Sequence, residues 1–181
     1  MIKLSQYFLG IVYTMSSKQS HNIRNRATAN DIFITPEKLA ISHIKLIPEK
    51  YHNCIWLDPC KNSGNYYNNF PNNCIKNYCE ILEDKDFFNY TETTQVICGN
   101  PPYSILNKWL DKSIQLKPDI ISYLISQGAL TTRRIENMEK AGYGLINLHL
   151  TKVYNWYGMS YIATFEKGKE SILSYDRTIW R

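Results

Sequence analysis

The segment Asn100-Pro101-Pro102-Tyr103 combines groups that suit a planar ligand bearing an amino group. It follows the run 95–98, which is typical of a buried strand. Two successive prolines remove two backbone N–H donors and favour an extended, rigid chain. The Asn100 amide oxygen and the Pro101 carbonyl can then accept both N–H bonds, while the Tyr103 ring stacks on the ligand. An ordinary turn or a proline-rich recognition motif is the alternative.

A second loop with a carboxylate follows the strand-like run 54–57. Asp58 and Pro59 come first, and Ser63 and Gly64 supply small side chains. Ligands bind outside the carboxyl ends of parallel strands, and backbone approaches a ligand closely only where side chains are small. Asp58 is therefore a candidate to hold an amino or hydroxyl group of a cofactor. A plain strand–turn–helix corner is the alternative.

Both loops need strands that end at one edge of a sheet. From residue 31 the sequence alternates β-rich runs with helical patterns, which favours an α/β fold with a mostly parallel sheet. Thr35 as N-cap and Pro36 at the first helical position predict a helix that ends before Pro48. Further helices are expected at 104–116 and 133–141. Strands are expected at 54–57, 75–82, 95–98, 120–125, 145–150 and 161–165, the last two as an antiparallel hairpin.

Composition restricts the class of protein. The 181 residues are 44% apolar and 20% charged, which is typical of one globular domain. Residues 1–30 are expected to form a partly disordered extension, and 31–181 a single domain. The apolar run 7–13 is too short for a membrane span, which takes about 20 residues. Five cysteines without a C-x-x-C pair predict a reduced, cytoplasmic chain without a structural metal.

The positive charge lies mainly in the second half of the chain. Residues 100–181 carry 11 basic and 7 acidic groups, against 10 and 9 in residues 1–99, and the whole chain has a net charge of +5. This indicates where an anionic partner such as nucleic acid would lie. Arg133 and Arg134 follow a predicted strand end and are candidates for phosphate contact. A solvated pair at a helix start is the alternative.

The order of these motifs resembles that of the S-adenosylmethionine-dependent N6-adenine methyltransferases in which the cofactor motifs precede the Asn-Pro-Pro-Tyr motif. The resemblance covers roughly residues 31–167. It implies a Rossmann-like class I methyltransferase catalytic domain over 31–181, with a mostly parallel seven-stranded sheet and a C-terminal antiparallel hairpin. It also implies S-adenosylmethionine as the cofactor.

The resemblance implies roles for the first two motifs. Phe33, Thr35 and Pro36 are similar to the family's motif at the methionine end of the cofactor. The loop 58–66, with its Asp-Pro and Gly64, is similar to the loop that wraps the methionine part. Asn62 stands where the family has its first glycine. Because Asn tolerates left-handed backbone better than other non-glycine residues, the turn is feasible.

Further acidic and aromatic residues complete the implied cofactor site. Glu80 matches the acid that holds the ribose hydroxyls, with Glu83 close by as the alternative. Asp86 and Phe87 are similar to the pair that reads the cofactor's adenine. Cys60 is expected to be a structural thiol, because the Pro-Cys nucleophile of cytosine-C5 enzymes follows a different strand.

The implied reaction is direct methyl transfer to the N6 amino group of an adenine in DNA. The base must be unpaired or flipped out, with Tyr103 as its stacking platform and Trp156 and Tyr157 near it. Acceptance of both N–H bonds by Asn100 and Pro101 favours a pyramidal nitrogen, so that orientation and dipoles do the catalysis.

Three alternatives stay open at this point: RNA adenine, a glutamine amide of a protein, and a non-catalytic partner subunit with the same fold. The Asp-Pro of the first loop favours nucleic acid over a protein amide, and DNA is preferred over RNA. Base readout needs an element that fills a groove, and only residues 168–181 follow the motifs. We therefore expect loose specificity, a single-stranded substrate, a separate specificity subunit or a homodimer.

Overall fold

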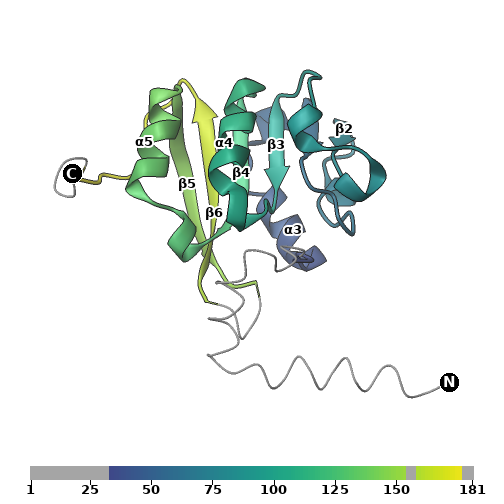
Figure 1. The fold of residues 1–181 in the computed structure, drawn as a ribbon, viewed down its shortest axis with the longest axis horizontal. Helices are drawn as coiled ribbons and strands as arrows, with labels where there is room; N and C mark the ends of the chain where they lie inside the picture. Colours follow the sequence, from purple (N-terminus) through teal and green to yellow (C-terminus); the bar gives the residue numbers. More distant parts are fainter. Residues whose placement is uncertain (1–32, 154–157, 177–181) are drawn as a thin grey trace, which may run out of the picture.

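A computed structural model describes residues 33–153 and 158–176 of the chain. The expected N-terminal extension, Trp156 and Tyr157 lie outside the described residues. Within these described residues, six strands form one sheet in the order β2-β1-β3-β4-β6-β5. The four strands β1 to β4 are parallel, and β5 and β6 form an antiparallel hairpin beside β4 (Figure 1). The strand bounds are Ile55–Asp58, Ile75–Tyr78, Val96–Gly99, Ile120–Ser126, Tyr143–Thr151 and Ser160–Lys167.

The strand number differs from the expected seven, since six are found in the described part of the chain. The strand expected over 75–82 ends at Tyr78. Beyond it the chain forms the 3-10 helices η3 (Ile81–Glu83) and η4 (Phe87–Asn89), each begun by an acidic side chain that binds a backbone N–H. These local side-chain bonds compete with further strand pairing.

Helices cover both faces of the sheet. α4 (Leu106–Gln115) and α5 (Thr132–Lys140) lie on one face and α3 (Glu37–Ile44) on the other (Figure 1). Neighbouring strand residues alternate between the two cores, as the period of two requires: Leu57 packs on the α4 side and Trp56 on the α3 side. No helix among the described residues is long and apolar enough to cross a membrane.

Two helix starts differ from the sequence-based expectation. Pro36, rather than Thr35, is the N-cap of α3, and its carbonyl accepts from Leu39 and Ala40. Thr35 is buried instead and belongs to the neighbouring loop. α4 begins at Leu106 rather than Ser104, because the chain after the two prolines first makes the 3-10 helix η5 (Tyr103–Ile105).

A buried polar network ties α3 to the centre of the sheet. The imidazole of His43 bonds to Tyr66 Oη and to Ser122 Oγ, both at 2.8 Å. Ser122 Oγ also bonds to Thr164 Oγ1 at 2.7 Å. Burial lowers the pKa of His43 to about 3, so the ring is neutral. Because Tyr66 belongs to the loop after β1, the network fixes that loop to the core.

Candidate functional site

A cavity of about 520 Å³ lies beside the carboxyl ends of β1, β2 and β3. Eight of the residues predicted to be catalytic or to bind the cofactor line it: Phe33, Thr35, Pro59, Glu80, Asp86, Phe87, Asn100 and Pro102. Glu83, the alternative to Glu80, lines it as well. Segments far apart in the sequence therefore meet at one edge of the sheet, as expected for parallel strands. The volume is in the range of sites for cofactors.

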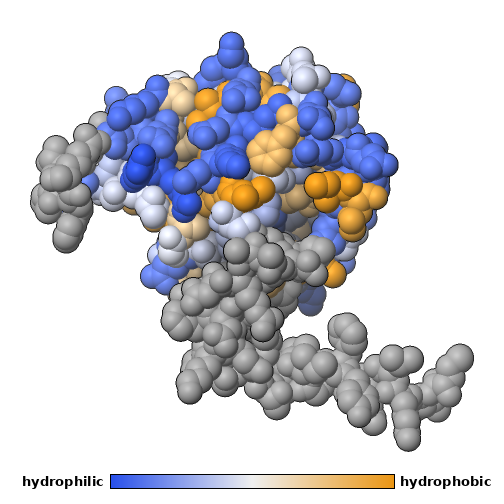
Figure 2. Space-filling model, viewed as in Figure 1, coloured by the Kyte–Doolittle hydropathy of each residue, from blue (hydrophilic) through white to orange (hydrophobic). Residues whose placement is uncertain are grey.

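Exposed apolar side chains surround the same cavity. Ile81 and Leu82 are 71% and 83% exposed, and Phe88 and Ile105 are each 37% exposed. Figure 2 shows hydrophobic residues gathered near the lower end of α4 and over the segment that follows β2. Exposed apolar groups next to a few polar ones are typical of a site for a ligand with a flat, apolar part.

Asp58 lies beneath the loop after β1, fully buried, and it is not among the residues that line the cavity. Its Oδ1 accepts a hydrogen bond of 3.2 Å from the backbone N–H of Cys60, while its Oδ2 is buried without a partner. Burial raises the pKa of the carboxyl to about 7. The carboxylate thus shapes the loop, and its second oxygen keeps an unused acceptor.

Two left-handed residues shape the loop that follows. Asn62 has φ 47° and Gly64 has φ 83°. The turn with Asn62 in place of glycine is therefore formed, as the tolerance of Asn for this backbone allows. A side chain at Gly64 would also meet Asn68 Nδ2 at 3.0 Å. Gly64 serves the loop's conformation and does not line the cavity.

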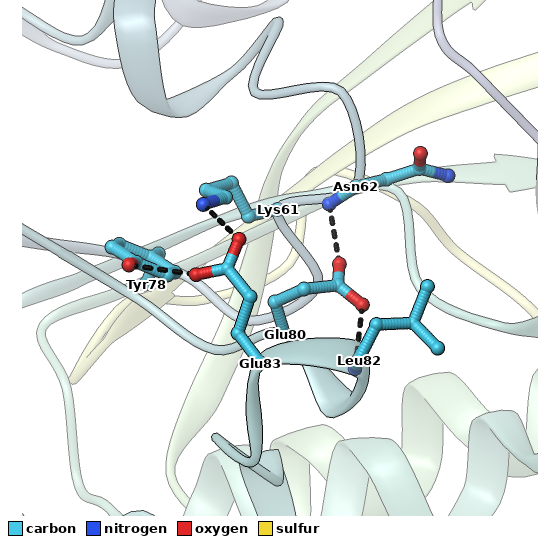
Figure 3. Close-up of polar contacts among 6 residues, drawn as sticks. All are labelled: Lys61, Asn62, Tyr78, Glu80, Leu82 and Glu83. Carbon is cyan, nitrogen blue, oxygen red and sulfur yellow. Dashed lines mark hydrogen bonds and ion pairs between the residues drawn. The ribbon is translucent and has the colours of Figure 1, made fainter.

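The two neighbouring acids after β2 have different partners (Figure 3). Glu80 accepts from the backbone N–H groups of Asn62 at 2.7 Å and Leu82 at 3.1 Å. Glu83 binds side chains instead, with Lys61 Nζ at 2.5 Å and Tyr78 Oη at 2.9 Å. The bond to Lys61 lowers the pKa of Glu83. Both acids line the cavity. Glu80 holds the loop there through backbone donors, whereas the carboxylate of Glu83 is paired with side chains.

The segment before α3 is joined to the loop after β1. Asn65 Nδ2 donates to the Thr35 carbonyl at 2.7 Å. Phe33 and Thr35 line the cavity, and Pro36 does not. The hydrogen bond explains how a motif some 30 residues before the loop, counted in the sequence, reaches the same site.

Aromatic rings form the wall near Asp86. Phe87 is buried against Trp109, with ring centroids 4.6 Å apart and planes at 32°. Phe88 meets the same indole edge-on at 5.4 Å. Asp86 Oδ1 accepts from the backbone N–H of Phe88 at 2.9 Å, which fixes the turn that presents both rings. Trp109 lines the cavity as well.

The Asn-Pro-Pro-Tyr segment presents an amide oxygen to the cavity. Asn100 lines it, and its Oδ1 is buried without a hydrogen-bond partner. The backbone carbonyl of Asn100 accepts from Cys60 Sγ at 3.0 Å. Pro102 has extended backbone, with φ −66° and ψ 120°. Tyr103 is not among the lining residues, and its hydroxyl donates to the Leu124 carbonyl at 3.3 Å. Its stacking role stays a prediction.

The two arginines lie in a second groove of about 530 Å³ between α4 and α5. Arg134 Nε donates to Asn107 Oδ1 at 2.7 Å, and its Nη1 donates to the Ala129 carbonyl at 2.5 Å. Arg134 therefore joins α5 to the start of α4. Arg133 is exposed at the same groove. Phosphate contact stays a prediction for both residues.

Several lining residues were not predicted from the sequence, among them Leu82, Phe88, Ile105 and Trp109. A usable signal existed for Leu82 and Phe88, because each is a large apolar residue within the acidic, turn-forming stretch 80–92. Trp109 lies on the apolar stripe of a helix, a pattern that indicates core and says nothing of a cavity.

Comparison with protein-family models and with curated proteins finds no match. Solved structures do match. A candidate RNA methyltransferase from Pyrococcus horikoshii is similar with a TM-score of 0.61 at 12% identity, over 75% of this chain and 87% of that one. A methyltransferase from Pyrococcus furiosus has a TM-score of 0.56 at 18% identity, over 86% and 100%.

A third similar structure holds a ligand. The magnesium protoporphyrin IX methyltransferase of Synechocystis, with bound S-adenosylmethionine, has a TM-score of 0.52 at 9% identity, over 88% of this chain and 96% of that one. Two of these three proteins are described with different substrates, and the third is described without one. What they share with this chain is the fold. The chain has the Rossmann-like methyltransferase fold, with six strands in its described part and an antiparallel hairpin at the end.

Proposed function

We propose that the chain is an S-adenosylmethionine-dependent methyltransferase that modifies the N6 amino group of adenine in nucleic acid, with DNA as the first candidate substrate. The observation that carries the proposal is the buried, unpartnered Oδ1 of Asn100, which lines the cavity next to residues from three other motifs. A buried acceptor without a partner costs about 1–3 kcal/mol, so a site that keeps one is suited to a donor from a ligand.

The chemistry of the cavity fits the cofactor. Glu80 has carboxylate acceptor capacity left after its two backbone bonds and would accept from the ribose hydroxyls. Asp86 and the rings near it would hold the adenine, and Phe33 and Thr35 would lie at the methionine end. When bound, S-adenosylmethionine supplies an electrophilic methyl group on a sulfonium.

The residues of this chain would orient the acceptor. Asn100 Oδ1 accepts one N–H of the target amino group, and the Pro101 carbonyl is proposed to accept the other. Both bonds favour a pyramidal nitrogen whose lone pair points at the methyl group, so catalysis rests on orientation and on fixed dipoles. A bound cofactor and base would displace water from the partly apolar cavity, and these dipoles then act more strongly.

RNA adenine is the second candidate, because the same amino group and the same loop serve either polymer, and one fold neighbour is described as a candidate RNA methyltransferase. A glutamine amide of a protein and a non-catalytic partner role are the remaining alternatives. Recognition of the target sequence is proposed to come from a homodimer or from a separate specificity subunit. Arg133 and Arg134 are the proposed phosphate contacts, and Arg133 is the more exposed of the two.

The test is transfer of tritiated methyl groups from S-adenosylmethionine to duplex DNA, single-stranded DNA, RNA and a protein extract in parallel, followed by nucleoside mass analysis. N6-methyladenine in DNA supports the first candidate, and N6-methyladenine in RNA alone supports the second. Label in protein only would overturn the nucleic-acid proposal. Cofactor binding without any transfer would favour the non-catalytic reading.

A further inference from the structure

The loop after β1 and the Asn-Pro-Pro-Tyr segment contact each other directly. Cys60 Sγ donates to the backbone carbonyl of Asn100 at 3.0 Å. Gly99 immediately precedes Asn100, and a side chain at Gly99 would meet Pro59 Cδ at 3.1 Å and Asp58 Oδ1 at 3.2 Å. The absence of a side chain at Gly99 therefore lets the two loops touch, and the thiol bonds them together.

The thiol has the properties that this bond needs. Burial raises the pKa of Cys60, so its sulfur keeps the proton that it donates. The backbone N–H of Cys60 is bound by Asp58, and the next residue, Lys61, donates its N–H to the Cys79 carbonyl at 2.8 Å. Cys60 is thus held on both sides, which makes it a firm support for the carbonyl that it contacts.

The carbonyl that Cys60 contacts belongs to Asn100, whose side chain is proposed to hold the target amino group. Asn100 is followed by two prolines, which donate no backbone N–H and restrict the chain. Its backbone position therefore sets where Oδ1 lies in the cavity. Cys60 lines the same cavity on the side of the loop that is proposed to wrap the cofactor. A shift of that loop would be passed to Asn100 through the thiol.

We propose that Cys60 is a positioning residue that couples occupation of the cofactor part of the cavity to the placement of the Asn100 carboxamide. The inference rests on the proposed function and deepens it. It assigns Cys60 no covalent step. It predicts that cofactor binding raises the affinity for the target adenine, and that the gain depends on the thiol or on another donor at this position.

The experiment compares the wild type with Cys60→Ala, Cys60→Ser and the control Cys74→Ala, which removes a partly buried thiol outside the cavity. Cys60→Ala removes one neutral hydrogen bond and should lower kcat about three- to tenfold. The Kd for S-adenosylmethionine should stay within about twofold of the wild type. Cys60→Ser keeps a donor and should restore most of kcat, and Cys74→Ala should behave as the wild type.

A second readout needs no turnover. In protein labelled with ¹⁵N-asparagine, the carboxamide signal of Asn100, assigned with Asn100→Asp, should shift on addition of S-adenosylmethionine in the wild type and in Cys60→Ser. It should shift much less in Cys60→Ala. An equal shift in all variants, or equal losses of kcat and cofactor affinity in Cys60→Ala, would overturn the coupling. A wild type that shows the shift yet methylates no nucleic acid would contradict the proposed function and leave the coupling supported.

Discussion

Glu80 Oε2 accepts the backbone N–H of Asn62 at 2.7 Å, and so the acid after β2 holds the left-handed turn of the loop after β1 (Figure 3). One carboxylate thereby joins two motifs at the cavity. Its neighbour Glu83 makes its bonds to Lys61 and Tyr78 at the surface. The two acids lie three residues apart in the sequence and have separate tasks.

Glu80→Gln should therefore weaken S-adenosylmethionine binding by about tenfold or more, because it removes a charged acceptor both for the ribose and for the loop. Glu83→Gln is the matched control at the same cavity and should change the Kd less than about twofold, since the Glu83 carboxylate is already paired with Lys61 and Tyr78. Calorimetric titration of both variants measures the difference. Equal effects of the two substitutions would remove Glu80 from the cofactor site.

Asp58 should make stability depend on pH near neutrality. Its pKa is about 7 in the fold against 3.8 in an unfolded chain, so its contribution is fully present below pH 3.8 and is lost as the pH rises through 7. Asp58→Asn mimics the protonated form and keeps an acceptor for Cys60. Its advantage in unfolding free energy over the wild type should grow between pH 4 and 8, by on the order of a few kcal/mol.

Urea unfolding of both proteins at several pH values measures this advantage. A constant difference would show that Asp58 is ionised throughout that range. Added S-adenosylmethionine, which is cationic at its sulfonium, should reduce the difference if Oδ2 is available to it. Binding would then release a proton, seen as a dependence of the calorimetric enthalpy on the buffer.

His43 should give the opposite trend in acid. Its pKa is about 3 in the fold against 6.5 in an unfolded chain, so the neutral ring stabilises above pH 6.5 and this contribution is lost as the pH falls from 6.5 toward 3. His43→Gln removes the titration and leaves Tyr66 and Ser122 poorly paired, at a cost of about 2–4 kcal/mol near neutral pH. The gap between wild type and variant should narrow in acid, and a gap that stays constant would contradict the buried neutral ring.

Alanine substitutions of the two arginines in the groove between α4 and α5 should have different effects. Arg134→Ala should lower the unfolding free energy by about 1–2 kcal/mol, because Arg134 bonds to Asn107 and Ala129. Arg133→Ala should leave stability unchanged and reduce the salt dependence of nucleic-acid binding by about one charge. Thermal unfolding and binding at several salt concentrations test both. An unchanged salt dependence of binding in Arg133→Ala would contradict its assignment to phosphate.

The sequence predicts the parallel sheet and the meeting of its loops. The alternation of strands and helices along the chain and the residue types of the loops can both be recognised locally. The strands that precede Asp58 and Asn100 pair with each other in the structure, and eight of the predicted residues line one cavity. The direction of each side chain was not predictable. Asp58 turns beneath its loop, where the backbone N–H of Cys60 donates to it, and Trp109 serves both the core and the cavity.

The point at which the strand after residue 75 ends could not be predicted from local sequence patterns either. The stretch 79–95 carries apolar residues, yet Glu80 and Asp86 each begin a 3-10 turn by binding a backbone N–H. Such bonds decide between turn and strand, and they depend on geometry that the sequence does not state. The hydrogen bond from Cys60 to Asn100 joins residues 40 positions apart and depends on the fold as a whole.

The most direct test of the account is methyl transfer by Asn100→Ala to an adenine-containing DNA, measured together with its affinity for S-adenosylmethionine. We expect the rate to fall by at least about a hundredfold, as for loss of a main dipole in an active site, while the Kd for the cofactor stays within about twofold. Transfer at the wild-type rate, or a loss of cofactor affinity as large as the loss of rate, would contradict the central claim that Asn100 holds the target amino group.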